Sequence, residues 1–486
     1  MEGDMATPVV EKEMQRPATG RRIDLFEKFP SLKAFAETRS FQFLLIFPNF
    51  VIFYLFMLTG IFGNPMGNQN ITIIFIWILW WFLLIGVLVP LGSRLWCTMC
   101  PLPAPGEWLQ RGAIIEKPDP ERPLGLNKPW PKRFKNIWLQ NFGFLGLALF
   151  SVLLVTRPIV TVLVVGGIGV LATVLMLVYQ RRAFCVYLCP VSGFQGLYAM
   201  FAPLALRAID KGICKTHKGK KGCFFGAKQG DEKSYDAYPC PWFEYVGTMD
   251  RNNYCGLCME CLKSCQKDNI SLFLRPFGSD IRIKGYDEAW KAFIMAVLAM
   301  VYSITLLGPY GTVKDWANVT WSGEVRGFLV YAGSVAALCL LIFPGVHLLF
   351  AWLSKLFSRA REIPLKKVFV GYSYVLVPFG LLAWIAFSLP LLMVNGSYIL
   401  QVFSDPFGWG WDLFGTGHFP WTPFYPDAVP HLQVLILMIG LVFSIRKGYD
   451  VGRGLFQERG QVVRSLIPIT AYLVIITAGF LVFFTA

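Results

Sequence analysis

Charge is scarce in this chain. Of its 486 residues only 15% are charged, whereas an ordinary soluble domain carries about 25%. This shortage excludes a soluble enzyme and an intrinsically disordered chain. Histidine is scarcer still, with four residues, of which only His347 falls inside a clear apolar run. A membrane haem of the b type needs two histidines at matched depth, so the sequence disfavours one.

Two signals of other protein classes are also missing. The first 40 residues are polar and lack the apolar stretch of a secretory signal peptide, so we expect no cleaved leader. There is no Walker loop and no dinucleotide-binding glycine fingerprint. The glycines within 165–169 lie in an apolar run and indicate close helix packing instead.

Hydrophobic residues are abundant, at 55% of the chain, and the mean hydropathy is +0.51. A helix needs about 20 apolar residues to cross a hydrocarbon layer about 30 Å thick. The sequence therefore predicts an all-α polytopic membrane protein with about nine transmembrane helices. The expected spans are 41–62, 71–92, 136–156, 159–180, 289–309, 327–353, 367–394, 430–445 and 464–485. A further apolar run at 184–206 contains two prolines, and we expect it to be interfacial or re-entrant.

The 45 Lys and Arg residues outnumber the 30 Asp and Glu residues, and their positions predict the orientation. With nine spans and the N-terminus inside, 42 of the 45 fall on the cytoplasmic side, and only Arg157, Lys314 and Arg326 fall outside. The positive-inside rule thus favours an N-in, C-out topology. Because the cations then lie against anionic lipid headgroups, we expect membrane lipid as their partner and no nucleic acid.

Four segments follow from this pattern. Residues 1–40 form a cytoplasmic tail, in which apolar residues at helical spacing over 23–40 indicate a short helix, either on the membrane surface or packed on a partner. Residues 41–206 form a four-helix membrane unit, and residues 286–486 form a five-helix C-terminal membrane unit. Between them, residues 207–285 form a cytoplasmic region that is too small for a large apolar core. This favours a bound metal or cluster as the group that stabilises its fold.

The first membrane unit contains a degenerate repeat. Each helical hairpin ends in a basic, an aromatic and then a cysteine residue, followed by a Cys-Pro pair, over 94–101 and 182–190. Hairpin topology places both copies on one face. Their thiols are suited to binding a soft metal such as copper, holding a cluster or cycling as dithiols, unless the motifs are only helix-ending turns. The four residues are Cys97, Cys100, Cys185 and Cys189. For the nearby Glu107 we expect a lipid-headgroup partner.

The strongest motif is a C-x2-C-x2-C-x3-C run formed by Cys255, Cys258, Cys261 and Cys265. Three thiolates of such a run wrap around one [4Fe–4S] cube, and the fourth commonly serves a second cluster. Zinc fits this dense run poorly, and reducing cytoplasm disfavours disulfides. We expect Gly256 to give the backbone room to curl around inorganic sulfide.

The remaining ligands are open to two interpretations. If the chain holds two clusters, Cys240 completes the [4Fe–4S] cube of the run, and Cys265 joins Cys214 and Cys223 at a second centre. His217, at a C-x2-H spacing from Cys214, is then a candidate fourth ligand. If the chain holds only one cluster, its fourth ligand is Cys265 or Cys240, and the other residues form a zinc knot or remain free thiols.

The two Cys-Pro motifs followed by the cysteine run resemble the membrane polyferredoxins. That family includes NapH-type quinol dehydrogenase subunits, NosR-type proteins and the CcoG group linked to copper and oxidase assembly. The resemblance covers roughly 75–285. The first motif reads C-x2-CP where the family usually has C-x3-CP. The resemblance implies a ferredoxin-like [4Fe–4S] insertion and electron transfer at the cytoplasmic face of a prokaryotic inner membrane.

The leading hypothesis is an integral membrane protein that passes single electrons between a cytoplasmic or quinone donor and an acceptor in or across the membrane. We expect basic residues near the cluster, including Lys263, Lys267 and Arg275, to favour docking of an acidic ferredoxin- or flavodoxin-like donor. Two alternatives remain: copper binding or reduction by the Cys-Pro thiols, and a scaffold or sensor whose cluster is only structural.

Overall fold

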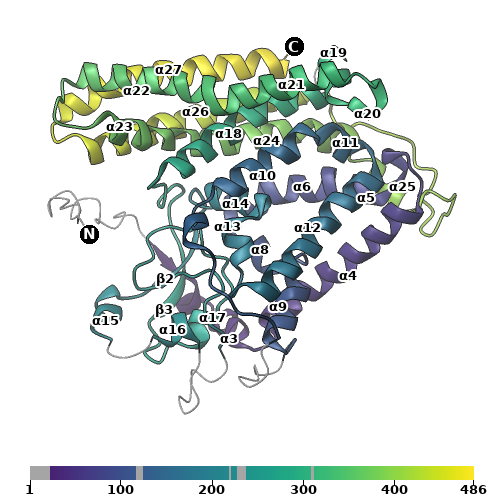
Figure 1. Ribbon diagram of the computed structural model, residues 1–486, viewed down its shortest axis with the longest axis horizontal. Helices are drawn as coiled ribbons and strands as arrows, with labels where there is room; N and C mark the ends of the chain where they lie inside the picture. Colours follow the sequence, from purple (N-terminus) through teal and green to yellow (C-terminus); the bar gives the residue numbers. More distant parts are fainter. Residues whose placement is uncertain (1–21, 116–123, 218–220, 227–236, 308–310, 486) are drawn as a thin grey trace.

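The computed structural model describes residues 22–115, 124–217, 221–226, 237–307 and 311–485. Over these residues the chain is mostly helical, and its long helices lie side by side in one apolar body (Figure 1). A smaller lobe, which carries most of the cysteine-rich region, lies against one end of that body.

Within the described residues, eight helical rods are long and apolar enough to cross a membrane, some of them made of helices joined end to end. This confirms a polytopic helical membrane protein. The rods are α4 (Phe41–Phe62), α5 to α7 (Ile71–Gly92), α12 (Pro158–Val178), the rod that begins with α18 (Tyr286–Leu306), α21 with α22 (Val325–Ser358), α23 with α24 (Leu365–Asn395), α26 (Ala428–Leu455) and α27 (Arg459–Phe484).

Two expected spans differ from the structure. The segment 136–156 is not one rod but two consecutive helices, α10 (Trp138–Leu149) and α11 (Ser151–Thr156), because the backbone leaves the helical conformation at Phe150. The run 430–445 was too short a prediction for α26, which continues about three turns beyond it to Leu455. Hydropathy falls at Arg446, but the hydrogen-bonded backbone does not end there.

The segment 184–206 lies inside the protein rather than along its surface. It forms α13 (Ala183–Tyr187) and α14 (Pro190–Tyr198), in which nearly every side chain is buried. Pro190 occupies the first turn of α14, where its missing N–H costs no hydrogen bond. The two Cys-Pro pairs thus differ, since Cys100 is the C-cap of α8 (Leu95–Met99) and Cys189 is the N-cap of α14.

A three-stranded antiparallel sheet departs from the expected all-α fold. Its order is β1 (Ile23–Asp24), β3 (Ile270–Leu274) and β2 (Leu204–Ala208). Strands β2 and β3 flank the cysteine-rich region in sequence and pair with each other, so the sheet fixes both ends of that region. The helix expected over 23–40 is interrupted, with α2 (Leu25–Lys28) and α3 (Pro30–Glu37) meeting at Phe29.

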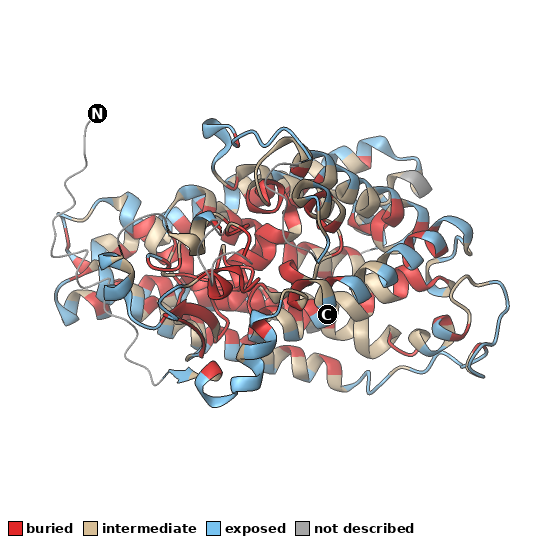
Figure 2. Cartoon of the chain, turned by 90° about the horizontal axis from the view of Figure 1, so that it is seen from below, coloured by how far each residue is buried: buried red, intermediate tan, exposed pale blue. Residues whose placement is uncertain are grey.

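Helix α18 (Tyr286–Tyr302) is the central element. Its most apolar window is 72% buried, against 22% for α12. It packs against α10 and α14 of the first membrane unit and against α24 (Leu376–Asn395) of the second. Figure 2 shows the buried residues concentrated in this middle zone. The two membrane units therefore share one core.

Trp384 on α24 joins the two units, and its replacement tests that core. The side chain is fully buried, its indole Nε1 donates to the Met295 carbonyl at 3.0 Å, and it lies edge-on to Trp81 and Phe194. We expect Trp384→Ala to destabilise the detergent-solubilised protein by about 3–5 kcal/mol. The matched control is Trp411→Ala, at an exposed loop tryptophan. Equal melting temperatures for the two variants would contradict the shared core.

Candidate functional site

The cysteine run lies in a tightly curled, buried loop. Cys255, Cys258 and Cys261 are all buried, and Leu257 and Met259 between them take positive φ angles of 59° and 64°. Gly256 has a packing role in this loop. A Cβ at this position would collide with the indole of Trp242, so glycine allows the loop to lie flat on that ring.

Cys240 lies with this run. It is buried, and it shares one buried cluster with Cys258 and Trp242. Burial raises the pKa of Cys258 and Cys261 well above the ordinary value of a thiol, and negative charge on Cys240 and Cys255 raises both further. Because these four thiols resist ionisation together, a bound cation would be needed to hold them as thiolates. We call Cys240, Cys255, Cys258 and Cys261 the first thiol group.

A second thiol group lines a small cavity of about 20 Å³ and consists of Cys214, Cys223 and Cys265 together with His217. Burial raises the pKa of Cys223 to about 12, with charge on Cys265 and Cys214 adding to the effect. Asn269 donates from its backbone N–H to Cys265 Sγ and from Nδ2 to Cys214 Sγ, both at 3.4 Å. Sequence reasoning missed Asn269, because an asparagine outside the cysteine motif gives no signal of its own.

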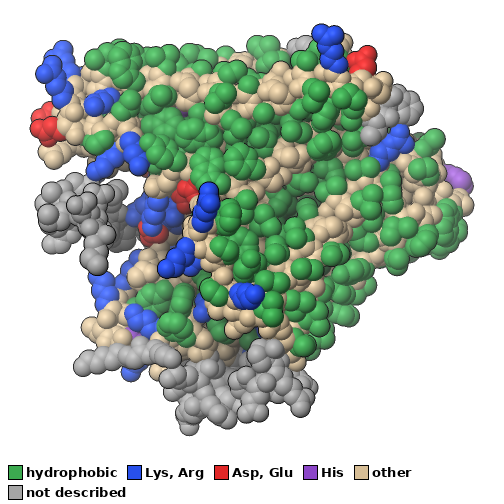
Figure 3. All heavy atoms as spheres, in the orientation of Figure 1, with side chains coloured by type: hydrophobic (Ala, Val, Ile, Leu, Met, Phe, Trp, Pro, Cys, Tyr) green, Lys and Arg blue, Asp and Glu red, His purple; other side chains and the backbone are tan. Residues whose placement is uncertain are grey.

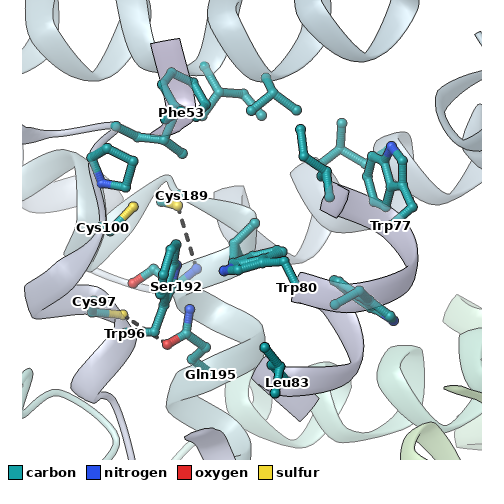
Figure 4. Close-up of a pocket in the computed structure, with 18 of the residues that line it drawn as sticks. Phe53, Trp77, Trp80, Leu83, Trp96, Cys97, Cys100, Cys189, Ser192 and Gln195 are labelled. Atoms are coloured by element: carbon teal, nitrogen blue, oxygen red, sulfur yellow. Dashed lines mark hydrogen bonds between the residues drawn. The ribbon is translucent and has the colours of Figure 1, made fainter. Parts of the chain in front are cut away.

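The third thiol group consists of the Cys-Pro cysteines Cys97, Cys100, Cys185 and Cys189, which line one cavity of about 380 Å³. Figure 4 shows Cys97, Cys100 and Cys189 on one side of it, with Trp77 opposite. Cys97 Sγ donates to Gln195 Oε1 at 3.3 Å, and Cys189 Sγ accepts from the Ser192 N–H at 3.5 Å. The rest of the cavity is apolar and largely aromatic. The two repeat copies thus meet at one place, as hairpin topology requires.

Part of the first thiol group and most of the third lie in one contiguous buried cluster, while Cys255 and Cys261 of the first group lie in a second one. In the shared cluster, Cys97, Cys185 and Cys189 pack with Cys240 and Cys258, and Trp242 lies among them. Trp242 Nε1 is buried and has no hydrogen-bond partner within the described part of the chain. This N–H lies against Gly256, between two cysteines of the run, and an unpaired indole N–H beside such a loop is a donor suited to an inorganic sulfide.

Across the described ranges, no three His, Cys, Asp or Glu side chains are placed so that they could hold one metal ion. The ligands of a single zinc ion stand only about 4 Å apart, given Zn–S bonds of about 2.3 Å. A [4Fe–4S] cluster has a different requirement, because each thiolate binds a different iron atom.

Three surface expectations are corrected by the structure. Glu107 is buried and ion-paired with Arg111 and Arg182 instead of reaching a lipid headgroup. Lys263 is buried against Glu260 at 3.0 Å, and Arg275 pairs with Asp280 at 2.7 Å. The structure describes all three basic residues that we expected to attract a donor, and among them only Lys267 is exposed.

The Glu107 ion pairs predict a pH dependence. Burial alone would raise the pKa of Glu107, but Arg111 and Arg182 outweigh it and hold the pKa below the ordinary carboxyl value. The stabilisation is therefore complete above the unfolded pKa, about 4.3, and is lost as the pH falls through the lower folded value.

We expect Glu107→Gln to destabilise the fold by about 3–5 kcal/mol at neutral pH, because two guanidinium groups lose their carboxylate. Melting temperatures measured from neutral to acidic pH check this, and the variant should lose the acid-dependent part of the wild-type decline. Asp268→Asn is the control, since its pair with Lys33 is half-exposed and worth about 0–1 kcal/mol. A variant as stable as wild type at neutral pH would contradict the account.

No family model, curated protein or solved structure matches the chain. The features that bear on function are its own: three thiol groups, one apolar cavity and a helical body long enough to span a membrane.

Proposed function

We propose that the protein is an integral membrane [4Fe–4S] protein that transfers electrons at the cytoplasmic face of a prokaryotic inner membrane, related to the membrane polyferredoxins. The observation that carries the proposal is the first thiol group, in which Cys240 packs with Cys258 of the run beside Trp242, whose N–H has no hydrogen-bond partner among the described residues. A bound [4Fe–4S] cluster supplies reversible one-electron transfer there.

The second thiol group supports a second cluster. Cys214, Cys223 and Cys265 would hold it, with His217 as the fourth ligand from the same cavity wall. Asn269 orients two of the sulfurs through its N–H groups. Hydrogen bonds to ligand sulfur disperse negative charge, so Asn269 would favour the reduced state of a bound centre.

The charge distribution supports the orientation. On the face that Figure 3 shows, most Lys and Arg lie along one side of the molecule, around the cysteine-rich lobe and at the neighbouring ends of the long helices, while a few lie at the opposite side. With the lobe side in the cytoplasm, 42 of the 45 cations satisfy the positive-inside rule. An acidic ferredoxin- or flavodoxin-like donor would approach the same basic side.

The cavity beside the Cys-Pro thiols supports a membrane-soluble partner. Its walls are almost entirely apolar, and Trp80, whose buried Nε1 lacks a partner among the described residues, contributes to them. Figure 4 shows Trp80 inside the cavity rim. An apolar ring with a hydrogen-bond-accepting oxygen, such as a quinone, has the chemistry that this lining would recognise.

Iron and sulfide analysis with redox-titrated EPR of anaerobically purified protein tests the proposal. We expect at least about eight iron atoms per chain from the first two thiol groups, and a signal that appears reversibly on reduction. Cys258→Ser should remove the signal of the first group, because its thiolate binds the cluster directly. Cys339→Ser, at a buried cysteine within the α21–α22 rod, is the control and should change neither quantity.

Three outcomes would contradict electron transfer. Protein without iron would reject the proposal outright. A cluster that is present but cannot be reduced reversibly would favour the scaffold or sensor alternative. Stoichiometric copper in place of iron would favour copper binding or reduction by the Cys-Pro thiols.

A further inference from the structure

Two buried cations near the Cys-Pro thiols have no acidic partner. Arg94 and Lys291 are each 1% exposed. In the described part of the chain, Arg94 Nε and Lys291 Nζ lack any hydrogen-bond partner, and neither side chain forms an ion pair. The carboxylate of Asp287, one turn before Lys291, accepts from the Ile137 N–H and lies beyond ion-pair distance of Lys291.

The two copies of the repeat can be compared directly, and only one of them has an acidic partner for its arginine among the described residues. Arg94 and Arg182 occupy equivalent positions, each three residues before the first cysteine of its motif, and both are fully buried. Arg182 is neutralised by Glu107, with Nε donating to Oε2 at 3.0 Å. Arg94 instead contacts the Asn253 carbonyl, the Ser192 hydroxyl and the face of Trp242. One copy of the repeat therefore carries a compensated charge and the other does not.

Both unpaired cations face the third thiol group. Arg94 Nη2 lies 3.6 Å from Cys97 Sγ. Lys291 Nζ lies against Gly193, one turn after Cys189 on α14, where a Cβ would collide with it. Burying an ion without a partner costs several kcal/mol, so a pair of them indicates an anionic group between them that restores neutrality.

We propose that Cys97, Cys100, Cys185 and Cys189 hold a third iron–sulfur cluster and that Arg94 and Lys291 are its countercharges. The inference rests on the proposed function, which gives this chain its clusters. Four thiolates around an oxidised [4Fe–4S] core carry a net charge of about −2, which two cations neutralise. The all-thiol donor set matches that of the first group, and Cys97, Cys185 and Cys189 share a buried cluster with its Cys240 and Cys258.

Lys291 also gives α18 a part in the site. The helix belongs to the C-terminal unit, yet its lysine lies against Gly193 of the first membrane unit, one turn after Cys189. An ionisable residue inside a membrane-spanning helix is rare and faces a functional interior by preference. Both cations favour the reduced, more negative state of a centre at this place.

Iron counting on the full-length, anaerobically purified protein separates this inference from the proposed function. Wild type should hold about four iron atoms more than the first two thiol groups account for. The double variant Cys97→Ser/Cys189→Ser should lose about those four, with the EPR signals of the first two groups intact. An unchanged iron content, or copper or zinc lost in its place, would overturn the third cluster. Wild type without iron would instead overturn the proposed function.

Lys291→Met tests the countercharge at nearly constant volume. We expect the midpoint potential of the third centre alone to shift to more negative values, or its iron alone to be lost, with Lys291→Arg restoring the wild-type behaviour. Lys284→Met is the control, since Lys284 is largely exposed and pairs with Asp250 at 3.0 Å. If Lys291→Met fails to fold, the polar variant Lys291→Gln takes its place. Unchanged iron and unchanged potential would overturn the assignment.

Discussion

A charge buried in a low-dielectric interior must be balanced by its neighbours, and the most buried cations of this chain gather where its cysteines meet. Arg182 is balanced by Glu107 and Arg207 by Asp280, each through side chains that are almost completely enclosed. Arg94 and Lys291 are enclosed to the same degree without a carboxylate. The anionic cluster that we propose among the Cys-Pro thiols would complete this balance.

The fold places the groups that need each other on different elements. The sheet of β1, β3 and β2 fixes the ends of the cysteine-rich region. Gly256 packs flat on Trp242, which lies beside the Cys-Pro thiols, so the cysteine loop and these thiols adjoin. Helix α18 then packs behind α14 and supplies Lys291. The thiol groups thus extend from the small lobe to the cavity in the helical body, which is the path that the proposed electron transfer would use.

The sequence was sufficient for features that depend on composition and local pattern. Apolar runs predicted the membrane rods, since only a helix satisfies its backbone inside lipid. The ferredoxin spacing favoured Cys240 as a partner of the run and Cys265 as a partner of Cys214 and Cys223. The structure packs Cys240 with Cys258 and places Cys214, Cys223 and Cys265 around one small cavity, while their role as cluster ligands stays a prediction. The predictions that failed depend on tertiary partners. No local pattern reveals that Arg182 draws Glu107 inward, that Glu260 holds Lys263, or that Trp242 requires Gly256.

Mössbauer spectroscopy of the iron-57-enriched, full-length protein tests the central claim most directly, because it distinguishes clustered from single iron and weighs each fraction. The account predicts that essentially all of the iron gives the signature of thiolate-bound [4Fe–4S] clusters in the oxidised state. Iron found only as mononuclear sites, or none at all in anaerobically prepared protein, would contradict it.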